Sequence, residues 1–157
     1  MDQSIVIVPY SNIYKDAFRK LNEEWITKYF NMEEMDRMVL YHPKEYILDK
    51  GGYIAIALLD GNPVGVCALV TYPYHGFDFE LSKMGVSPKA QCMGIGKLLA
   101  QHIITKAKIM GAKKIFLESS RKLGPAISLY KKLGFVEIDK IPSPYSRSDI
   151  QMELILK

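Results

Sequence analysis

The chain has 157 residues, of which 48% are hydrophobic and 24% are charged, a balance that fits one folded domain and excludes a disordered tail or a fibre. Its net charge of +4 is too small to distinguish a nucleic-acid partner from a small anionic ligand. The two cysteines, Cys67 and Cys92, form neither a CxxC motif nor a cluster with histidines, so we expect no disulfide and no metal.

The beginning of the chain, Met1 to Ser4, lacks a basic region followed by an apolar run. No stretch approaches the roughly 18 apolar residues that a membrane-spanning helix needs. We therefore expect no export, no membrane association and a cytoplasmic location. Because no linker or repeat interrupts the chain, residues 1–157 are predicted to form a single domain.

The N-terminal third is predicted to contain one strand followed by helices. Residues 5–8 are a short run of strand formers, and Ser11 is expected to cap a helix. Residues 32–40 are predicted to form a second helix, which His42-Pro43 ends, and residues 44–48 one further turn. The apolar face of the first helix consists of Ala17, Phe18, Leu21 and Trp25.

The central segment changes to strand patterns. Residues 53–59 and 64–72 are predicted strands, and Asp60-Gly61-Asn62-Pro63 between them is a turn signal, so the two form a hairpin. Residues 77–86 are predicted to form a third strand.

The C-terminal half alternates helices and strands. Residues 94–110 carry an apolar stripe at spacing four and end before Gly111, which favours a helix. A strand at 114–118 and a helix at 125–133 follow, the helix beginning with a proline. The last predicted strands are 135–138 and 149–156. This order predicts an α/β (α+β) domain with a mixed sheet.

A glycine loop, Gln91 to Lys97, separates the third strand from the strongest helix. The free N–H groups at a helix N-terminus bind anions, and glycines let the backbone approach a phosphate closely. Gln91 and Leu98 exclude a P-loop, and Leu99 excludes the dinucleotide fingerprint. A tight turn without any ligand is the alternative interpretation.

Two motifs together resemble those of the GNAT superfamily of N-acetyltransferases. Gln91, Gly94 and Gly96 fit the first motif, which is Gln or Arg, two residues, Gly, one residue, then Gly or Ala. Leu129-Tyr130 and Gly134-Phe135 fit the second, and the two motifs stand in the family's order. The resemblance covers residues 53–135, whereas the N-terminal helices fit the family's variable region by position alone.

The resemblance implies a mostly antiparallel sheet of six to seven strands with about four helices and a V-shaped opening between the fourth and fifth strands. Acetyl-CoA would bind in that opening, and no metal is implied. Backbone groups of the fourth strand would bind its pantetheine arm, and those of the glycine loop its pyrophosphate. The implied binding residues are Met84, Gly85, Val86, Gln91, Cys92, Met93, Gly94, Ile95, Gly96 and Lys97.

The implied reaction is direct attack of an amine on the acetyl thioester, which needs a base for the amine and an acid for the departing thiolate. Glu80 lies eleven positions before Gln91, the offset we expect for the family's base, in an apolar stretch that would raise its pKa. Asp78 on the same strand face is the alternative base, and Glu80 could instead pair with Lys83. Tyr130 matches the family's usual acid.

Leu123 departs from the family pattern, which often has Asn at this position; Ser119, Ser120 or Arg121 could replace it. His75 is interpreted first as a turn residue, with contact to the acceptor as the alternative. The aromatic residues near the end of the first helix are interpreted as core rather than as cleft wall; they are Trp25, Tyr29 and Phe30.

The predicted function is therefore N-acetylation of a small-molecule or peptide amine, with no nucleic acid or membrane as partner and with a homodimer admitted by the resemblance. The competing hypothesis is an acyl-CoA-binding sensor without turnover. The glycine loop would serve either function, and only the enzyme requires Glu80 and Tyr130.

Overall fold

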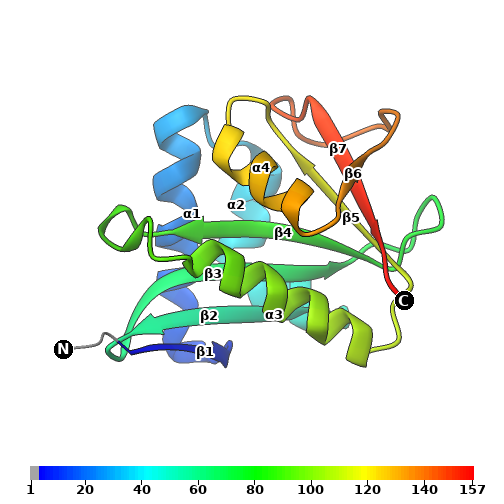
Figure 1. Ribbon diagram of the computed structural model, residues 1–157. Helices are drawn as coiled ribbons and strands as arrows, with labels where there is room; N and C mark the ends of the chain where they lie inside the picture. The colour runs from blue at the N-terminus through cyan, green and yellow to red at the C-terminus, as the bar shows by residue number, and fades with distance from the viewer. Residues whose placement is uncertain (1–3) are drawn as a thin grey trace.

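The computed structural model of the protein describes residues 4–157, in which seven strands form one sheet of order β1-β2-β3-β4-β5-β7-β6 (Figure 1). The residues Met1 to Gln3, in which we expected no leader, lie outside the described part. The strands are β1 (Ile5–Pro9), β2 (Tyr53–Leu59), β3 (Asn62–Thr71), β4 (Phe79–Val86), β5 (Lys114–Ser119), β6 (Val136–Glu137) and β7 (Ile150–Ile155). All neighbours are antiparallel except β4 and β5, which confirms the predicted mixed, mostly antiparallel sheet.

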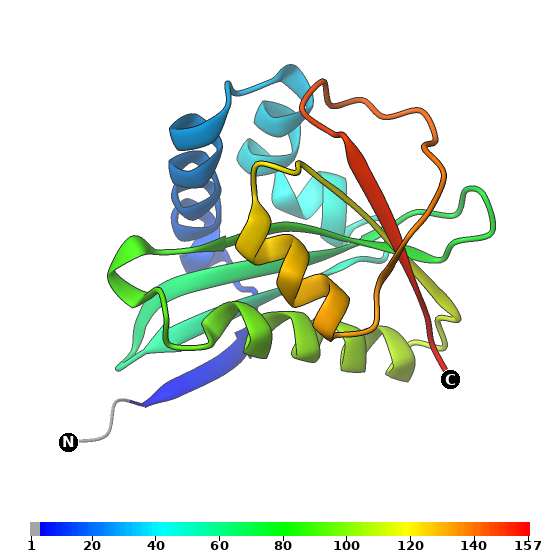
Figure 2. The ribbon, with the colours of Figure 1, turned by 45° about the horizontal axis from the view of Figure 1, so that its top comes forward.

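Helices cover both faces of this sheet. The longer helices are α1 (Lys15–Tyr29), α2 (Glu34–Tyr41), α3 (Ile95–Ile109) and α4 (Gly124–Lys132). Figures 1 and 2 show α1 and α2 on one face and α3 and α4 on the other. Each face has its own apolar core, because successive residues of a strand point to opposite sides. The central strands β2 and β3 are buried on both sides, and so their sequences are continuously apolar rather than alternating.

The hairpin between β2 and β3 has a two-residue turn instead of the four-residue turn we predicted. Asp60 and Gly61 have φ of 50° and 84°, as a type I′ turn requires, and Leu59 is the partner of Asn62. Strand β3 therefore begins at Asn62. The other predicted strands and the two C-terminal helices agree with the structure to within two residues at each end.

The first two helices begin later than predicted, and Ser11 is not a helix cap. Ser11 precedes a 3₁₀ turn, η1 (Asn12–Tyr14), and makes no capping hydrogen bond; α1 follows directly from that turn. The second helix starts at Glu34 because Glu33 and Asp36 form a reciprocal capping box. The predicted extra turn at Lys44–Leu48 is a π-helical turn, η2.

The parallel strands β4 and β5 separate soon after they meet, which confirms the predicted V-shaped opening. They pair only at Phe79 with Ile115 and at Glu80 with Phe116. Beyond Glu80, strand β4 contains a bulge at which the register against β3 shifts, and Lys83 there has a φ of +53°. The extra residue turns the Lys83 side chain toward α2, where it contacts Asp36.

The β4 strand also passes very close to α1 after this bulge. A Cβ atom on Gly85 would lie 2.8 Å from the carbonyl oxygen of Leu21 and 3.0 Å from Cδ1 of Trp25. Only glycine allows this approach, so the helix packs on the strand at the position where the opening lies.

Candidate functional site

The opening between β4 and β5 is a cleft of about 210 Å³, which we call the β4–β5 cleft. It is lined by β4, by the segment from β5 to α4, by the end of α1 and by the loop before β7. The lining residues of β4 and the loop after it are Glu80, Leu81, Ser82, Lys83, Met84, Gly85, Val86 and Gln91. Those of the other segments are Trp25, Phe30, Glu118, Ser119, Ser120, Leu123, Ala126, Tyr130, Tyr145, Arg147 and Ser148.

One wall of the cleft is a free strand edge. After the pair of Glu80 with Phe116, no strand in the described part of the chain pairs with the β5 side of β4 as far as Val86. The backbone groups along such an edge can hydrogen-bond an extended ligand, as an added strand would. Met84, Gly85 and Val86, which we predicted to bind pantetheine, all line this wall.

The glycine loop stands at the N-terminus of α3. Gly94 is the N-cap residue with a φ of 75°, and the first helical hydrogen bond runs from the amide of Leu98 to the carbonyl of Gly94. The amides of Ile95, Gly96 and Lys97 therefore have no partner within the helix, and the helix dipole adds positive potential there.

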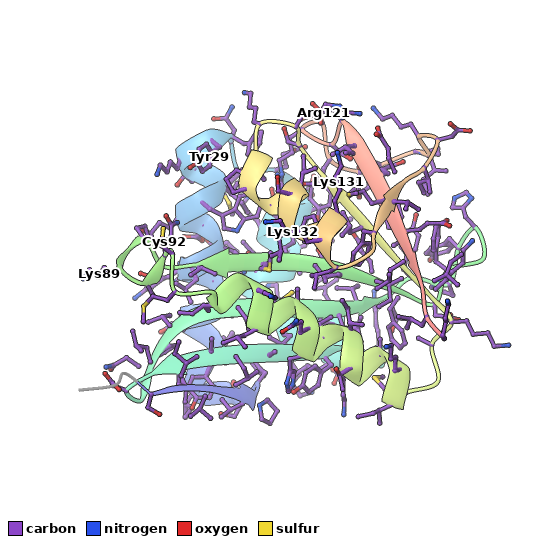
Figure 3. The ribbon with its side chains drawn as sticks, viewed as in Figure 1. Tyr29, Lys89, Cys92, Arg121, Lys131 and Lys132 are labelled. Carbon is purple, nitrogen blue, oxygen red and sulfur yellow. The ribbon has the colours of Figure 1, made fainter. Side chains whose placement is uncertain are left out.

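Side chains leave this end of α3 accessible. No heavy atom lies within 4 Å of a Cβ placed on Gly94, and the side chain of Ile95 turns into the core. Figure 3 shows Lys89 and Cys92 on the loop between β4 and α3. Both are exposed, as is Lys97, so the loop combines free amides with positive charge.

Glu80 lies at the point where the two strands separate. Leu81, its neighbour, packs into the core on the α3 side, so the Glu80 carboxylate points to the face that α1 and α2 cover. Burial and the nearby Glu118 raise the pKa of Glu80 to about 8, although Lys83 acts in the opposite direction. Within residues 4–157 no hydrogen bond or ion pair engages this carboxylate. Lys83, its predicted alternative partner, instead binds Asp36.

Asp78, the alternative base, has a structural role. Its carboxylate accepts hydrogen bonds from the backbone amides of Lys113 and Lys114, at 2.8 and 3.1 Å. These bonds attach the start of β4 to the start of β5. Asp78 does not line the cleft.

Tyr130 lies on the opposite face of the sheet, where it is 7% exposed in the core beneath α4 and lines the cleft. Burial raises the pKa of its phenol, so it keeps its proton at neutral pH. The amide of Phe135 donates to the carbonyl of Tyr130 at 3.0 Å, and the two rings pack edge to face. Gly134 makes this closure possible with a φ of 102°. The spacing from Tyr130 to Gly134-Phe135 in the second motif is therefore explained by the way the chain turns at the C-terminal end of α4.

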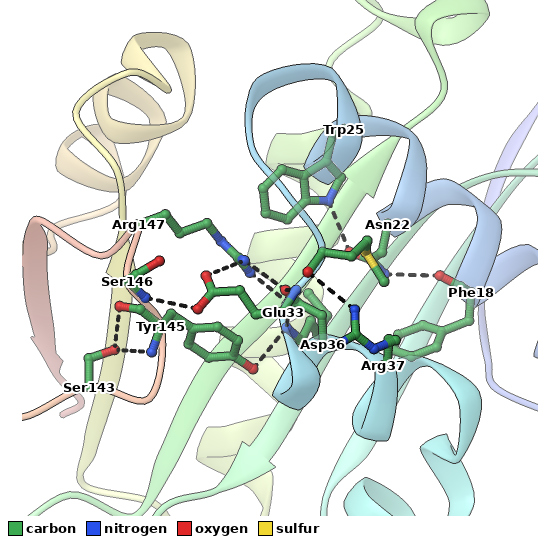
Figure 4. A network of polar contacts seen from close by, with 12 residues as sticks. Phe18, Asn22, Trp25, Glu33, Asp36, Arg37, Ser143, Tyr145, Ser146 and Arg147 are labelled. Atoms are coloured by element: carbon green, nitrogen blue, oxygen red, sulfur yellow. Dashed lines mark hydrogen bonds and ion pairs between the residues drawn. The ribbon is translucent and has the colours of Figure 1, made fainter.

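Asp36 is the centre of a buried charge network that sequence reasoning missed (Figure 4). Lys83 and Arg147 each donate to its carboxylate at 2.7 Å, and Lys83 also donates to the hydroxyl of Tyr145 at 2.9 Å. Burial alone would raise the pKa of Asp36, but the hydrogen bond from Arg147 and the charge of Lys83 lower it to about 2. The network joins α2, β4 and the loop before β7, and Asp36 is 47 residues from Lys83 and 111 residues from Arg147 along the chain.

Two aromatic residues that we interpreted as core are instead cleft wall. Trp25 and Phe30 line the β4–β5 cleft, whereas Tyr29 is exposed. The indole N–H of Trp25 donates to Asn22, which is itself buried and bonded to the carbonyl of Phe18. The Trp25 ring is therefore held in one orientation.

The segment between β5 and α4 does not single out one residue as the replacement for the Asn that the family often has at the position of Leu123. Leu123 lines the cleft with an apolar side chain, and both Ser119 and Ser120 lie beside it in the lining. Arg121 turns away, and its guanidinium pairs with Glu137. His75 is an exposed turn residue with a φ of 53°, outside the cleft lining.

Three further residues of the cleft were not predicted from the sequence as site residues. Glu118 follows the apolar centre of β5, and Tyr145 and Ser148 lie in the loop before β7. Ser148 Oγ is the one buried side-chain nitrogen or oxygen without a hydrogen-bond partner in the described residues. Strand alternation in β5 could have identified Glu118, because it lies two residues after Phe116.

Residues 4–157 contain neither a candidate metal site nor a helix that could span a membrane. No three side chains among His, Cys, Asp and Glu gather in a way that could hold a metal ion. None of the described helices has both the length and the apolar composition that crossing a membrane requires.

Comparison with known proteins agrees with the fold. The pattern of the Acetyltransferase (GNAT) family matches residues 14–135. An N-acetyltransferase of Escherichia coli, YjgM, is 34% identical over 99 residues, which are 63% of this chain and 52% of YjgM. The chain thus spans about half the length of this curated relative.

Solved structures match over nearly the whole chain. An acetyltransferase of the GNAT family from Staphylococcus aureus has a TM-score of 0.87 at 23% identity, covering 98% of this chain and 100% of that one. The structure of yncA from Salmonella typhimurium with acetyl-CoA has a TM-score of 0.75 at 17% identity, covering 98% and 95%. At these identities the likeness establishes the fold.

Proposed function

Because the chain belongs to the Acetyltransferase (GNAT) family, we propose that it transfers the acetyl group of acetyl-CoA to a primary amine. One observation carries the proposal. The Glu80 carboxylate on one face of the sheet and the Tyr130 phenol on the other both line the β4–β5 cleft. A base and an acid thus flank one opening, as direct acyl transfer requires.

The described residues fit acetyl-CoA as the acyl donor. The free edge of β4 at Met84, Gly85 and Val86 suits the pantetheine amides. The amides of Ile95, Gly96 and Lys97 at the helix N-terminus suit the pyrophosphate, with Gln91, Cys92, Met93 and Gly94 in the same loop. The Leu123 side chain adds only apolar contact.

In the proposed reaction the acceptor enters as an ammonium ion and loses a proton to Glu80. The nitrogen lone pair then attacks the thioester carbonyl carbon, the C–N bond forms and the C–S bond breaks. The departing sulfur takes the Tyr130 proton, and the proton that the new amide nitrogen loses restores the Tyr130 phenol. Glu80 passes the first amine proton to solvent. With a pKa of about 8, Glu80 is a much better base than an exposed carboxylate.

Binding of acetyl-CoA is tested by thermal unfolding. At a concentration about 100 times its Kd, the ligand should stabilise the fold by about 2.7 kcal/mol, which for a domain of this size raises Tm by roughly 5–10 °C. An unchanged Tm at saturating acetyl-CoA would refute the cofactor assignment.

Turnover is tested by CoA release with a panel of amines and by the variant Tyr130→Phe. Removing a general acid should lower kcat by about 100-fold or more while the acetyl-CoA-induced rise in Tm persists. Tyr74→Phe is the matched control, since Tyr74 is exposed and outside the cleft lining. A full rate in Tyr130→Phe would exclude it as the acid. Binding without turnover of any amine would favour the sensor hypothesis.

A further inference from the structure

Four charged side chains line the β4–β5 cleft, and its two cations are already neutralised. Lys83 and Arg147 both bind the buried Asp36, and Arg147 also binds Glu33 at 3.2 Å. Lys83, Arg147, Asp36 and Glu33 together carry no net charge. A carboxylate on the acceptor would therefore find no free cation in the described part of the lining.

The aromatic rings of the cleft are likewise occupied by the protein's own cations. The Tyr145 ring lies 4.4 Å from Lys83 Nζ and 4.6 Å from the guanidinium carbon of Arg147. The same guanidinium lies 5.7 Å from the Trp25 ring centre. The network therefore already uses these rings for cation–π contacts.

The charged groups of the lining that have no ion-pair partner in residues 4–157 are the two acids, Glu80 and Glu118. Glu80 has no ion-pair partner in residues 4–157, and Glu118 accepts a single hydrogen bond, of 3.4 Å, from Gln151. Leu81 and Leu117 pack on the α3 side, so Glu80 and Glu118 both point to the α1 side. Since Glu80 pairs with Phe116, the two carboxylates stand on neighbouring strands, two residues apart in register.

Ser148 supplies a second, independent indication of a ligand. The residue is 5% exposed and lines the cleft, and its Oγ has no hydrogen-bond partner among residues 4–157. A buried hydroxyl without a partner costs free energy unless a ligand satisfies it. Its oxygen can accept a hydrogen bond from an N–H group.

We propose that the acceptor carries a second ammonium group and that Glu118 and Ser148 bind it. The inference rests on the proposed function and narrows its substrate class to linear diamines and polyamines. One ammonium loses its proton to Glu80 and reacts. The other stays charged, is attracted by Glu118 and donates to Ser148 Oγ. An amine whose far end is a carboxylate is repelled by Glu118.

Three amines that differ only at one end test the proposal: butane-1,4-diamine, n-butylamine and 4-aminobutanoate. After a twofold correction for its two equivalent amino groups, the diamine should have a kcat/KM about tenfold above that of n-butylamine, corresponding to one added charge interaction. The amine with a carboxylate should be the poorest. Tm shifts with the three amines, at saturating CoA, measure the same order without turnover.

Variants test which residues of the cleft cause the preference for the diamine over n-butylamine. Glu118→Gln should reduce the ratio of diamine to n-butylamine to about two or less, and Ser148→Ala should reduce it several-fold. Asp139→Asn, which removes an exposed acid outside the cleft lining, should leave the ratio unchanged. The Tm of each variant without amine checks that it folds.

The outcomes separate this inference from the proposed function. Equal kcat/KM and equal Tm shifts for the diamine and n-butylamine would overturn the inference while leaving the acetyltransferase in place. A preference that persists in Glu118→Gln would also overturn it. If Ser148→Ala weakens only acetyl-CoA binding, Ser148 belongs to the donor site. Failure of acetyl-CoA itself to raise Tm would refute the proposed function.

Discussion

At the scale of single residues, Glu80 owes its chemical character to its neighbours. It lies at the last pair of β4 with β5, where burial and Glu118 both disfavour its charged form. No ion pair in the described residues compensates. The same carboxylate in an exposed strand would be ionised at neutral pH and a weak base.

The raised pKa of Glu80 predicts the pH dependence of the rate. If Glu80 is the base, kcat/KM should rise with pH through about 8 and level off above it, because the deprotonated form is needed. Glu80→Gln should abolish this rise and lower the rate by about 100-fold or more. A rate profile from pH 6 to 10 with an amine of known pKa measures both. A rise that survives in Glu80→Gln would assign the titration to another group.

The same shift predicts an effect on stability. The pKa of Glu80 is raised from 4.5 to about 8, so between these pH values the unfolded chain has lost a proton that the folded protein keeps. Glu80 therefore makes the free energy of unfolding fall as pH rises through this window. Glu80→Gln should remove that decline, and urea unfolding at pH 5 and pH 8.5 tests it. Glu24→Gln, on an exposed position of α1, is the control.

At the scale of secondary structure elements, the bulge and the glycine of β4 shape the cleft. The bulge directs Lys83 toward α2 while Met84 and Val86 pack on the α3 side. Gly85 then lets α1 approach, and that helix carries Trp25 to the cleft wall. A strand of the same length without the bulge would bury Lys83 among apolar side chains.

Gly85→Ala should therefore damage both the fold and the site. The new Cβ would lie 2.8 Å from a backbone oxygen of α1 that cannot rotate away, so we expect a loss of about 1–3 kcal/mol in the free energy of unfolding. The displaced helix should also weaken acetyl-CoA binding. Gly124→Ala is the matched control, because a Cβ there meets nothing within 4 Å, and it should be neutral or slightly stabilising. Equal stability of the two variants would show that α1 adjusts freely.

At the scale of the whole molecule, the Asp36 network joins regions that the chain keeps far apart. It links α2 to the bulge of β4 and to the loop before β7, so this side of the cleft is assembled from the N-terminal, central and C-terminal regions (Figure 4). Buried ion pairs add little net stability, but the loss of one partner leaves the other charges unpaired.

Asp36→Ala should accordingly destabilise the protein by about 3–5 kcal/mol at pH 7, because two buried cations lose their common partner. Lys83→Met should cost less, since Arg147 still neutralises Asp36. Asp36 has its pKa lowered from 3.8 to about 2, so its contribution is present above pH 3.8 and is lost as the pH falls through about 2. Urea unfolding of both variants measures the difference. A larger loss in Lys83→Met would contradict this account.

The sequence by itself determined the parts of this protein that depend on neighbours along the chain. Strand and helix patterns, the glycine loop before α3 and the spacing from Tyr130 to Phe135 are local. Each of these features involves residues that are close together in the chain, so the order of residues was enough to predict it. The resemblance carried by the two motifs predicted Glu80 and Tyr130 as candidates, and both lie in one cleft.

Only the tertiary structure decided what surrounds those candidates. Asp78 accepts hydrogen bonds from two backbone amides and lies outside the cleft lining, which distinguishes it from Glu80. Trp25 and Phe30, which we expected in the core, line the cleft. The tertiary structure also brought Glu118 and Ser148 into the lining of the same cleft as Glu80. Long-range contacts of this kind depend on how α1, α2 and the C-terminal loop pack on the sheet. Burial and charge, which set the pKa of Glu80, are properties of that packing and not of the order of residues.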